Sequence, residues 1–186
     1  KEKEKMFRYI DAVAPQMAAM SDDIFDHPEL GLNEYHAFAL LTDWLEQEGF
    51  AVERGVAGVE TAFRAIYHHG NGGPNIGLLC EYDALPEIGH ACGHQLQGPS
   101  ILAAAAALKN SEADGNYTVT VYGTPAEESV SGKIMMLKNG CTFEELDVAL
   151  MMHGSGATQV DVKSLALSRF KVVFHGVSAH AAVKPE

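Results

Sequence analysis

The chain of 186 residues has only three cysteines, only 13 basic residues and no long apolar run, and each scarcity excludes a class of protein. Three cysteines are too few, and odd in number, for a secreted domain held together by disulfides. The 13 Lys and Arg face 25 Asp and Glu, and the net charge of −12 disfavours nucleic acid and anionic membranes as partners. No apolar run reaches the ~20 residues of a membrane helix. We therefore expect neither a nucleic-acid nor a membrane partner.

What remains is the composition of a globular protein, with 47% hydrophobic residues. The charged start, Lys1 to Lys5, lacks the apolar stretch of a signal peptide, so we expect the protein in the cytoplasm. Reduced thiols fit that compartment. We interpret Cys80 and Cys141 as packing residues, which leaves one cysteine for chemistry.

Periodicity predicts alternating helices and strands. Helices are expected at residues 2–26, 32–48, 99–109 and 129–139, and strands at residues 59–68, 76–80, 118–122 and 148–152. A Gly- and Pro-rich turn at residues 70–74 suggests a hairpin between the first two strands. The later strand, helix, strand alternation predicts an α/β fold with a mostly parallel sheet flanked by helices.

The pattern changes near residue 165. Phe170, Val172 and Phe174 alternate with polar residues, which is typical of a half-buried antiparallel strand. We therefore expect a first domain over residues 1–164 and the beginning of a smaller second domain over residues 165–186.

Three apolar runs each end in residues that bind metals or transfer protons. These residues are Glu81 to Asp83 after the first run, Glu127 and Glu128 after the second, and His153 after the third. Because ligands bind at the carboxyl ends of the strands in open α/β sheets, the repetition predicts one shared site. The segment from His90 to His94 follows the first run and adds a thiol and two imidazoles.

This set of side chains favours a metal site. Only a glycine separates Cys92 from His94, so both can face one ion, and Zn²⁺ accepts thiolate, imidazole and carboxylate ligands. Of two adjacent glutamates, one can bind metal while the other transfers a proton. Asp83 could orient a ligand imidazole.

Each of these residues also has a purely structural interpretation. Cys92 and His94 could be a buried cysteine beside a hydrogen-bonded histidine, and the glutamates could be a solvated helix start. His153 could bond to backbone, and Asp83 could form a turn. We interpret the remaining histidines as structural, with His90 the ambiguous one among them: His27, His36, His68, His69, His90 and His175.

Five motifs occur in order along the chain: Glu81-Tyr82-Asp83-Ala84-Leu85-Pro86, Gly89-His90-Ala91-Cys92-Gly93-His94, Gly123-Thr124-Pro125-Ala126-Glu127-Glu128, Met151-Met152-His153 and Ser178-Ala179-His180-Ala181-Ala182. Together they resemble the metal-dependent amidohydrolases of peptidase family M20, which include hippurate hydrolase, auxin-conjugate hydrolases and p-aminobenzoyl-glutamate hydrolase. The Glu-Tyr-Asp form of the first motif is most similar to the branch with β-alanyl-lysine-type dipeptidases.

The resemblance implies a zinc-exopeptidase-like catalytic domain that holds two divalent ions, Zn or Mn, and cleaves the amide bond of an N-acyl amino acid or a dipeptide. It implies that Cys92 bridges the two ions and that His94, Glu128 and His153 are further ligands. Asp83 then contacts a ligand side chain and not an ion. Glu127 is then the general base. It also implies that the second domain is a lid that forms a homodimer and that His180 reaches the partner's active site.

The sequence departs from the family pattern at Gln95, where Asn or Asp is usual, and at Gly154, where Pro is common. Family members also continue well beyond residue 186 and supply one more histidine ligand. We therefore expect the 186 residues alone to be inactive and to bind metal weakly. Two alternatives stay open: a hydrolase with Cys92 as nucleophile and His94 or His153 as base, and a metal-binding module without catalysis.

Overall fold

A computed structural model describes residues 2–111, 113–141 and 143–160, together with residues 162, 166, 168, 170–177, 179, 180 and 182. The chain divides into two compact units, Lys1–Ser155 and Gly156–Glu186. The helices, the strands and most of the predicted site residues belong to the first unit. The predicted boundary between residues 164 and 165 stays a prediction.

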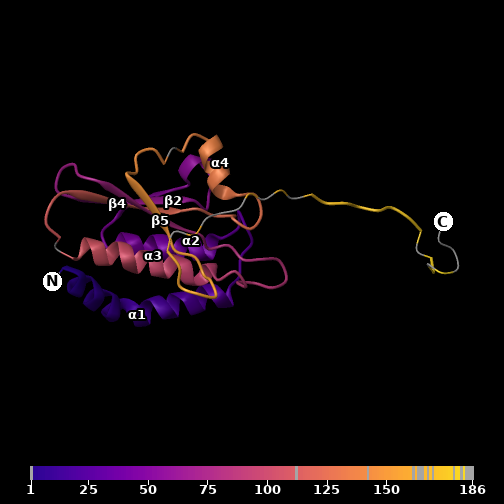
Figure 1. Cartoon of the computed structure of the whole chain (residues 1–186), viewed down its shortest axis with the longest axis horizontal. Helices are drawn as coiled ribbons and strands as arrows, with labels where there is room; N and C mark the ends of the chain where they lie inside the picture. Colours follow the sequence, from indigo (N-terminus) through magenta and orange to yellow (C-terminus); the bar gives the residue numbers. More distant parts are fainter. Residues whose placement is uncertain are drawn as a thin grey trace. The chain divides into compact units, whose positions relative to one another are not determined.

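The described residues of the first unit form one five-stranded sheet and four α-helices (Figure 1). The helices are α1 (Glu2–Asp26), α2 (Tyr35–Gln47), α3 (His94–Lys109) and α4 (Gly132–Lys138). The strands are β1 (Ala51–Arg54), β2 (Phe63–His69), β3 (Asn75–Cys80), β4 (Tyr117–Gly123) and β5 (Val148–Met151), and a short 3-10 helix, η1 (Val56–Gly58), follows β1. The strand order is β1-β2-β4-β3-β5.

The α/β class is confirmed, but the sheet is mixed. β3 runs parallel to β4 and β5, whereas β2 is antiparallel to β1 and β4. The predicted hairpin across residues 70–74 is wrong, because β4 lies between β2 and β3. The hairpin that forms instead joins β1 to β2, and β1 was not predicted.

The two faces of the sheet bury different side chains, as strand geometry requires. On β2, Phe63 and Ala65 enter the larger core with residues of α1, α2 and α3. On β4, Tyr122 points to the other face and packs with Met136 of α4 and Val56 of η1. Figure 1 shows the same layers, with α4 on the opposite side of the sheet from α2 and α3, and α1 beyond them.

Three predicted helices begin at different residues than expected. α2 begins at Tyr35 rather than residue 32, after Leu32 adopts a left-handed φ of 68°. α3 begins at His94, directly after Gly93 with φ 87°, so Pro99 lies inside the helix and not at its start. α4 begins at Gly132, after a turn that occupies residues 127–130.

Two expectations about burial and strands do not hold for the described residues. The apolar composition of β5 predicts burial, but all four of its residues are exposed, and β5 lies at the edge of the sheet. The alternation of Phe170, Val172 and Phe174 predicts a strand, yet residues 170–177 have no regular secondary structure and are exposed. A lone strand needs a pairing partner, and no other described residue of the second unit supplies one. No described helix is long and apolar enough to cross a membrane.

Candidate metal centre

The parallel half of the sheet positions the site. In the ladder, Cys80 at the end of β3 pairs with Gly123 at the end of β4, and Leu79 pairs with Met151 of β5. Thr124 fixes the two central ends, since its N–H donates to the Cys80 carbonyl at 2.8 Å. The segments that follow β3, β4 and β5 therefore all begin at the same end of the sheet, where the carboxyl ends of these strands lie. The predicted convergence of the three runs is confirmed.

Asp83 and His94 form the buried part of the site, and each is 1% exposed. His94 Nδ1 lies 3.0 Å from the Asp83 carbonyl and 3.1 Å from Asp83 Oδ1, so Nδ1 carries the proton and donates it. In the neutral form of this imidazole the lone pair then lies on Nε2. Burial, which lowers the pKa of His94, is outweighed by the carboxylates of Asp83 and Glu81, which raise it. Burial alone would raise the pKa of Asp83, but the hydrogen bonds from His94 and from the Glu128 amide lower it.

Cys92 and His153 form the outer part of the site. The Cys92 Sγ lies 3.6 Å from His153 Nε2. His153 Nδ1 donates to the Gly154 carbonyl at 2.9 Å, which again leaves Nε2 as the atom with the lone pair. The His153 ring meets the His94 ring edge-on, with 5.6 Å between the centroids. Both imidazoles thus have the tautomer that a metal ligand requires.

Glu127 and Glu128 enter the site from the turn after β4. The Glu128 amide donates to Asp83 Oδ2 at 2.9 Å, which ties this turn to the end of β3. One donor atom each of His94, Glu127 and Glu128 lies within 4.8 Å of the others. Burial and the neighbouring carboxylates of Glu81 and Glu128 raise the pKa of Glu127.

The turn that carries the two glutamates is stabilised by contacts with the segment that connects α1 and α2. Ala126 has a left-handed φ of 59°, which is strained for a residue with a Cβ. Its N–H donates at 2.7 Å to the fully buried carboxylate of Glu34, whose other oxygen accepts the Thr61 hydroxyl at 2.9 Å. Gly31 lies against the turn, because a Cβ there would come within 2.9 Å of Ala126 Cα.

A second buried carboxylate, Glu81, lies at the site; the sequence placed it at a strand end without assigning it a role. Glu81 is 2% exposed, its Oε2 lies 3.3 Å from His94 Nε2, and its other oxygen pairs with Lys133 of α4. Gln97 of α3 completes this contact, because its Nε2 donates to Glu81 Oε2 at 3.2 Å. The position of Glu81, two residues before Asp83 at a strand end, could have indicated that both carboxylates face the site.

The residues present fit a divalent metal. The donor atoms of Cys92, His94 and His153 also lie within 4.8 Å of one another, so His94 belongs to two groups of possible ligands. His94 Nε2 is buried and makes no hydrogen bond in the described part of the chain, although Glu81 lies close. A buried nitrogen without a hydrogen bond is costly unless another group binds it. Thiol, imidazole and carboxylate together match the ligand set of Zn²⁺.

The remaining predicted residues lie outside this cluster. His90 is buried, and neither ring nitrogen has a hydrogen-bond partner among the described residues, while burial lowers its pKa. Gln95, one of the two departures from the family pattern, has a buried Oε1 that is likewise without a hydrogen bond. His180 belongs to the second unit, where its Nδ1 accepts the Ala182 amide at 3.2 Å, and Ser178 and Ala181 of its motif lie outside the described residues.

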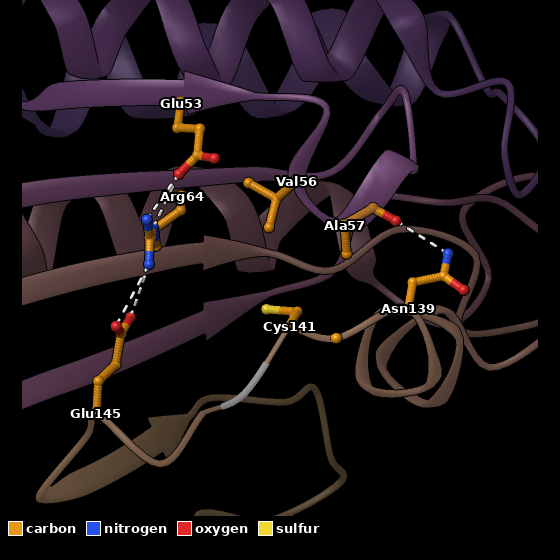
Figure 2. Close-up of a pocket in the computed structure, with 8 residues that line it drawn as sticks. Glu53, Val56, Ala57, Arg64, Asn139, Cys141 and Glu145 are labelled. Atoms are coloured by element: carbon orange, nitrogen blue, oxygen red, sulfur yellow. Dashed lines mark hydrogen bonds and ion pairs between the residues drawn. The ribbon is translucent and has the colours of Figure 1, made fainter.

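One cavity in the described part of the chain borders the cluster, and another lies away from it. A cavity of about 180 Å³ is bordered by Glu127 and by Lys133. Another, of about 260 Å³, is shown in Figure 2, where Arg64 lies between Glu53 and Glu145. Its guanidinium is paired on both sides, at 2.8 Å and 3.2 Å, so this second cavity presents no unpaired cation to an anionic ligand.

Comparison with known proteins identifies the family of the chain. The family model described as "Peptidase family M20/M25/M40" matches residues 77–184. The chain belongs to this family. It is 38% identical to the mouse (Mus musculus) Xaa-Arg dipeptidase, over 98% of this chain and 45% of the relative. It is 35% identical to one of the subunits of p-aminobenzoyl-glutamate hydrolase from Escherichia coli K12, over 98% of this chain and 42% of the relative.

Among solved structures, the chain is similar to the YXEP protein of Bacillus subtilis, described as a dinuclear metal-binding peptidase of the M20 family. The TM-score is 0.66 with 27% sequence identity, over 78% of this chain and 44% of that one. The chain therefore spans about half the length of the relatives that it matches.

Proposed function

We propose that the whole protein is a metal-dependent hydrolase that cleaves the amide bond of an N-acyl amino acid or a dipeptide. The observation that carries the proposal is the position of His94 in two groups of possible ligands, one with Cys92 and His153 and the other with Glu127 and Glu128. The dipeptidase and amidohydrolase relatives support the reaction class. Two divalent ions, Zn or Mn, and a location in the cytoplasm belong to the proposal.

In this proposal Cys92, His94, Glu128 and His153 hold the ions, which when bound would polarise the amide carbonyl and acidify the attacking water. Asp83 keeps the His94 imidazole in the tautomer that presents Nε2. Glu127 removes the proton from the water and returns it to the leaving amine. The raised pKa of Glu127 suits this role, because a base that must also act as an acid works best with a pKa near the working pH.

The roles of the two glutamates are separable by matched substitutions in the full-length protein. Glu127→Gln should keep the metal content and lose activity by roughly 10²–10⁴, the usual contribution of a general base. Glu128→Gln should lose metal first. Elemental analysis and turnover of β-alanyl-lysine and hippurate measure both effects. Normal metal content in both variants, with only Glu128→Gln inactive, would reverse the assignment.

The short contact between Cys92 and His153 is the geometry that a cysteine nucleophile would need, so this alternative requires a test. Burial and the carboxylates of Glu128, Glu127 and Glu81 raise the pKa of the Cys92 thiol to about 12. A nucleophilic thiol needs a lowered pKa, whereas a nearby cation would convert this thiol to a ligand thiolate. A chelator should abolish metal-dependent activity. A cysteine hydrolase would survive the chelator and be inactivated by iodoacetamide.

The homodimer and the role of His180 are also part of the proposal, and their support is the family resemblance of the segment around this residue. His180 of one subunit would stabilise the oxyanion in the active site of its partner. Mixing inactive His180→Ala subunits with inactive Glu127→Gln subunits should then restore part of the activity, because one site of the mixed dimer has both groups. Failure to recover activity despite proven subunit exchange would remove His180 from the partner's site.

A further inference from the structure

A second group of metal-ligating side chains lies outside the site described above, at the junction of α1 and α2. It consists of Asp23 in the last turn of α1, His27 one turn later, and His36 in the first turn of α2. Asp23 Oδ1 lies 2.9 Å from His27 Nδ1 and 3.1 Å from His36 Nε2. The two imidazole centroids are 4.7 Å apart. One donor atom from each residue lies within 4.8 Å of the others.

These separations fit one coordination sphere. Zn–N and Zn–O bonds of about 2.0–2.2 Å in a tetrahedral site place neighbouring ligand atoms about 3.3 Å apart. The observed 2.9 Å and 3.1 Å need a small outward rotation of the side chains, and His27 Nδ1 must also give up its hydrogen bond to the Asp23 carbonyl at 2.8 Å. Asp23 and His27 are four residues apart, the spacing that brings two side chains together on one helix face. The three side chains are 39–60% exposed, so an ion can reach them from solvent.

The local charge also favours a cation. The last turn of α1 contains no basic residue but carries Asp23 and Asp26, and Asp22 lies directly before it. The carbonyl groups at a helix C-terminus add a partial negative charge. The carboxylate of Asp23 contacts both histidines. A cation bound between them would be attracted by the negative charge of this carboxylate and of its acidic neighbours.

We propose that Asp23, His27 and His36 bind one divalent transition-metal ion of the zinc type, in addition to any ions of the site around His94. Solvent would complete the coordination. Because His36 lies on α2 and the other two ligands lie at the end of α1, the ion links the two helices across residues 28–34. In that connection the backbone carbonyl of Glu29 accepts the Ala84 amide at 2.8 Å. The carboxylate of Glu34 accepts the amide of Ala126, the residue directly before Glu127. The proposal does not depend on the catalytic function.

The test is a Zn²⁺ titration against a chromophoric chelator, with Cys92→Ser, His153→Ala and Glu128→Gln introduced to remove ligands from both groups of the other site. One equivalent of Zn²⁺ should bind in this background. His27→Gln and His36→Gln should each weaken its binding at least tenfold, as should Asp23→Asn, which keeps the size of the side chain but removes its charge. His68→Gln is the matched control, because His68 is an exposed histidine on β2 whose ring contacts Thr118 instead.

Thermal unfolding provides a second measurement that also checks folding. Zn²⁺ should raise the Tm of the background protein and of His68→Gln, because an ion that binds only the folded state stabilises it. The rise should be lost in His27→Gln, whose side chain is exposed and whose metal-free Tm should be unchanged. Equal Zn²⁺ affinity and an equal rise of Tm in His27→Gln, His36→Gln and His68→Gln would overturn the proposal, as would the absence of a bound equivalent.

Discussion

The inner and outer parts of the candidate metal centre differ in how they are held. Asp83 and His94 are almost completely buried and joined by two contacts of 3.0–3.1 Å, and Asp83 also accepts the Glu128 amide. His153 follows an exposed edge strand, and its ring contacts Cys92 at 3.6 Å and the carbonyl of the next residue. The inner part is therefore built into the folded core, whereas the outer part contributes donor atoms without supporting the fold.

This difference separates stability from metal binding. Removal of an inner residue leaves buried polar groups unsatisfied and should unfold the chain more easily. Removal of an outer residue should leave the fold unchanged and affect only the ions.

Asp83→Ala should have the largest effect. It removes the acceptor of the Glu128 amide and one of the two acceptors of His94 Nδ1, which keeps the Asp83 backbone carbonyl, and one unsatisfied group costs roughly 1–3 kcal/mol. Urea unfolding of the metal-free chain measures this loss, with Asp11→Ala on the exposed face of α1 as the control. A loss below about 1 kcal/mol would mean that the inner part is not the stabilising one.

Glu34 should make stability depend on pH. Burial raises its pKa above the ordinary value of 4.5, so the folded chain binds more protons than the unfolded chain between 4.5 and the raised value. The free energy of unfolding should therefore fall as the pH rises through that window. Glu34→Gln should remove this part of the slope, while Glu87→Gln on an exposed loop controls for the change in net charge. An identical slope in Glu34→Gln and the parent chain would contradict the buried, charged role of Glu34.

His153→Ala should have the smallest effect on folding. The side chain is exposed, so the free energy of unfolding of the metal-free chain should change by less than about 0.5 kcal/mol. His94→Ala is the matched inner substitution and should cost several times more. If the two variants unfold at the same urea concentration, the inner and outer parts do not differ in the way described.

Sequence patterns predicted the parts of this fold that are encoded locally. The apolar runs became β3, β4 and β5, and the residues directly after them met at one edge because parallel strands end together. Sequence missed β1, since Ala51–Arg54 is short and half of it is charged. The expected hairpin failed because the insertion of β4 depends on long-range pairing, which a turn sequence does not encode.

The residues that position the site were harder to predict than the residues that supply its donor atoms. Cys92, His94 and the two glutamates were recognisable from their spacing, whereas Glu34 contacts Ala126 from 92 residues away. Glu81 and Lys133 are 52 residues apart, and nothing in the local sequence joins them. Contacts of this kind are set by how α1, α2 and α4 pack on the sheet, and that packing is a property of the folded chain.

The central claim is that Cys92 is a ligand in a divalent metal centre, and cobalt substitution of the full-length protein tests it most directly. A thiolate bound to Co²⁺ gives a near-ultraviolet charge-transfer absorption, and only the thiolate form of cysteine is a ligand. We predict this absorption in the parent protein and in Cys141→Ser, and its loss in Cys92→Ser. Its absence from the parent protein, or its persistence in Cys92→Ser, would contradict the account.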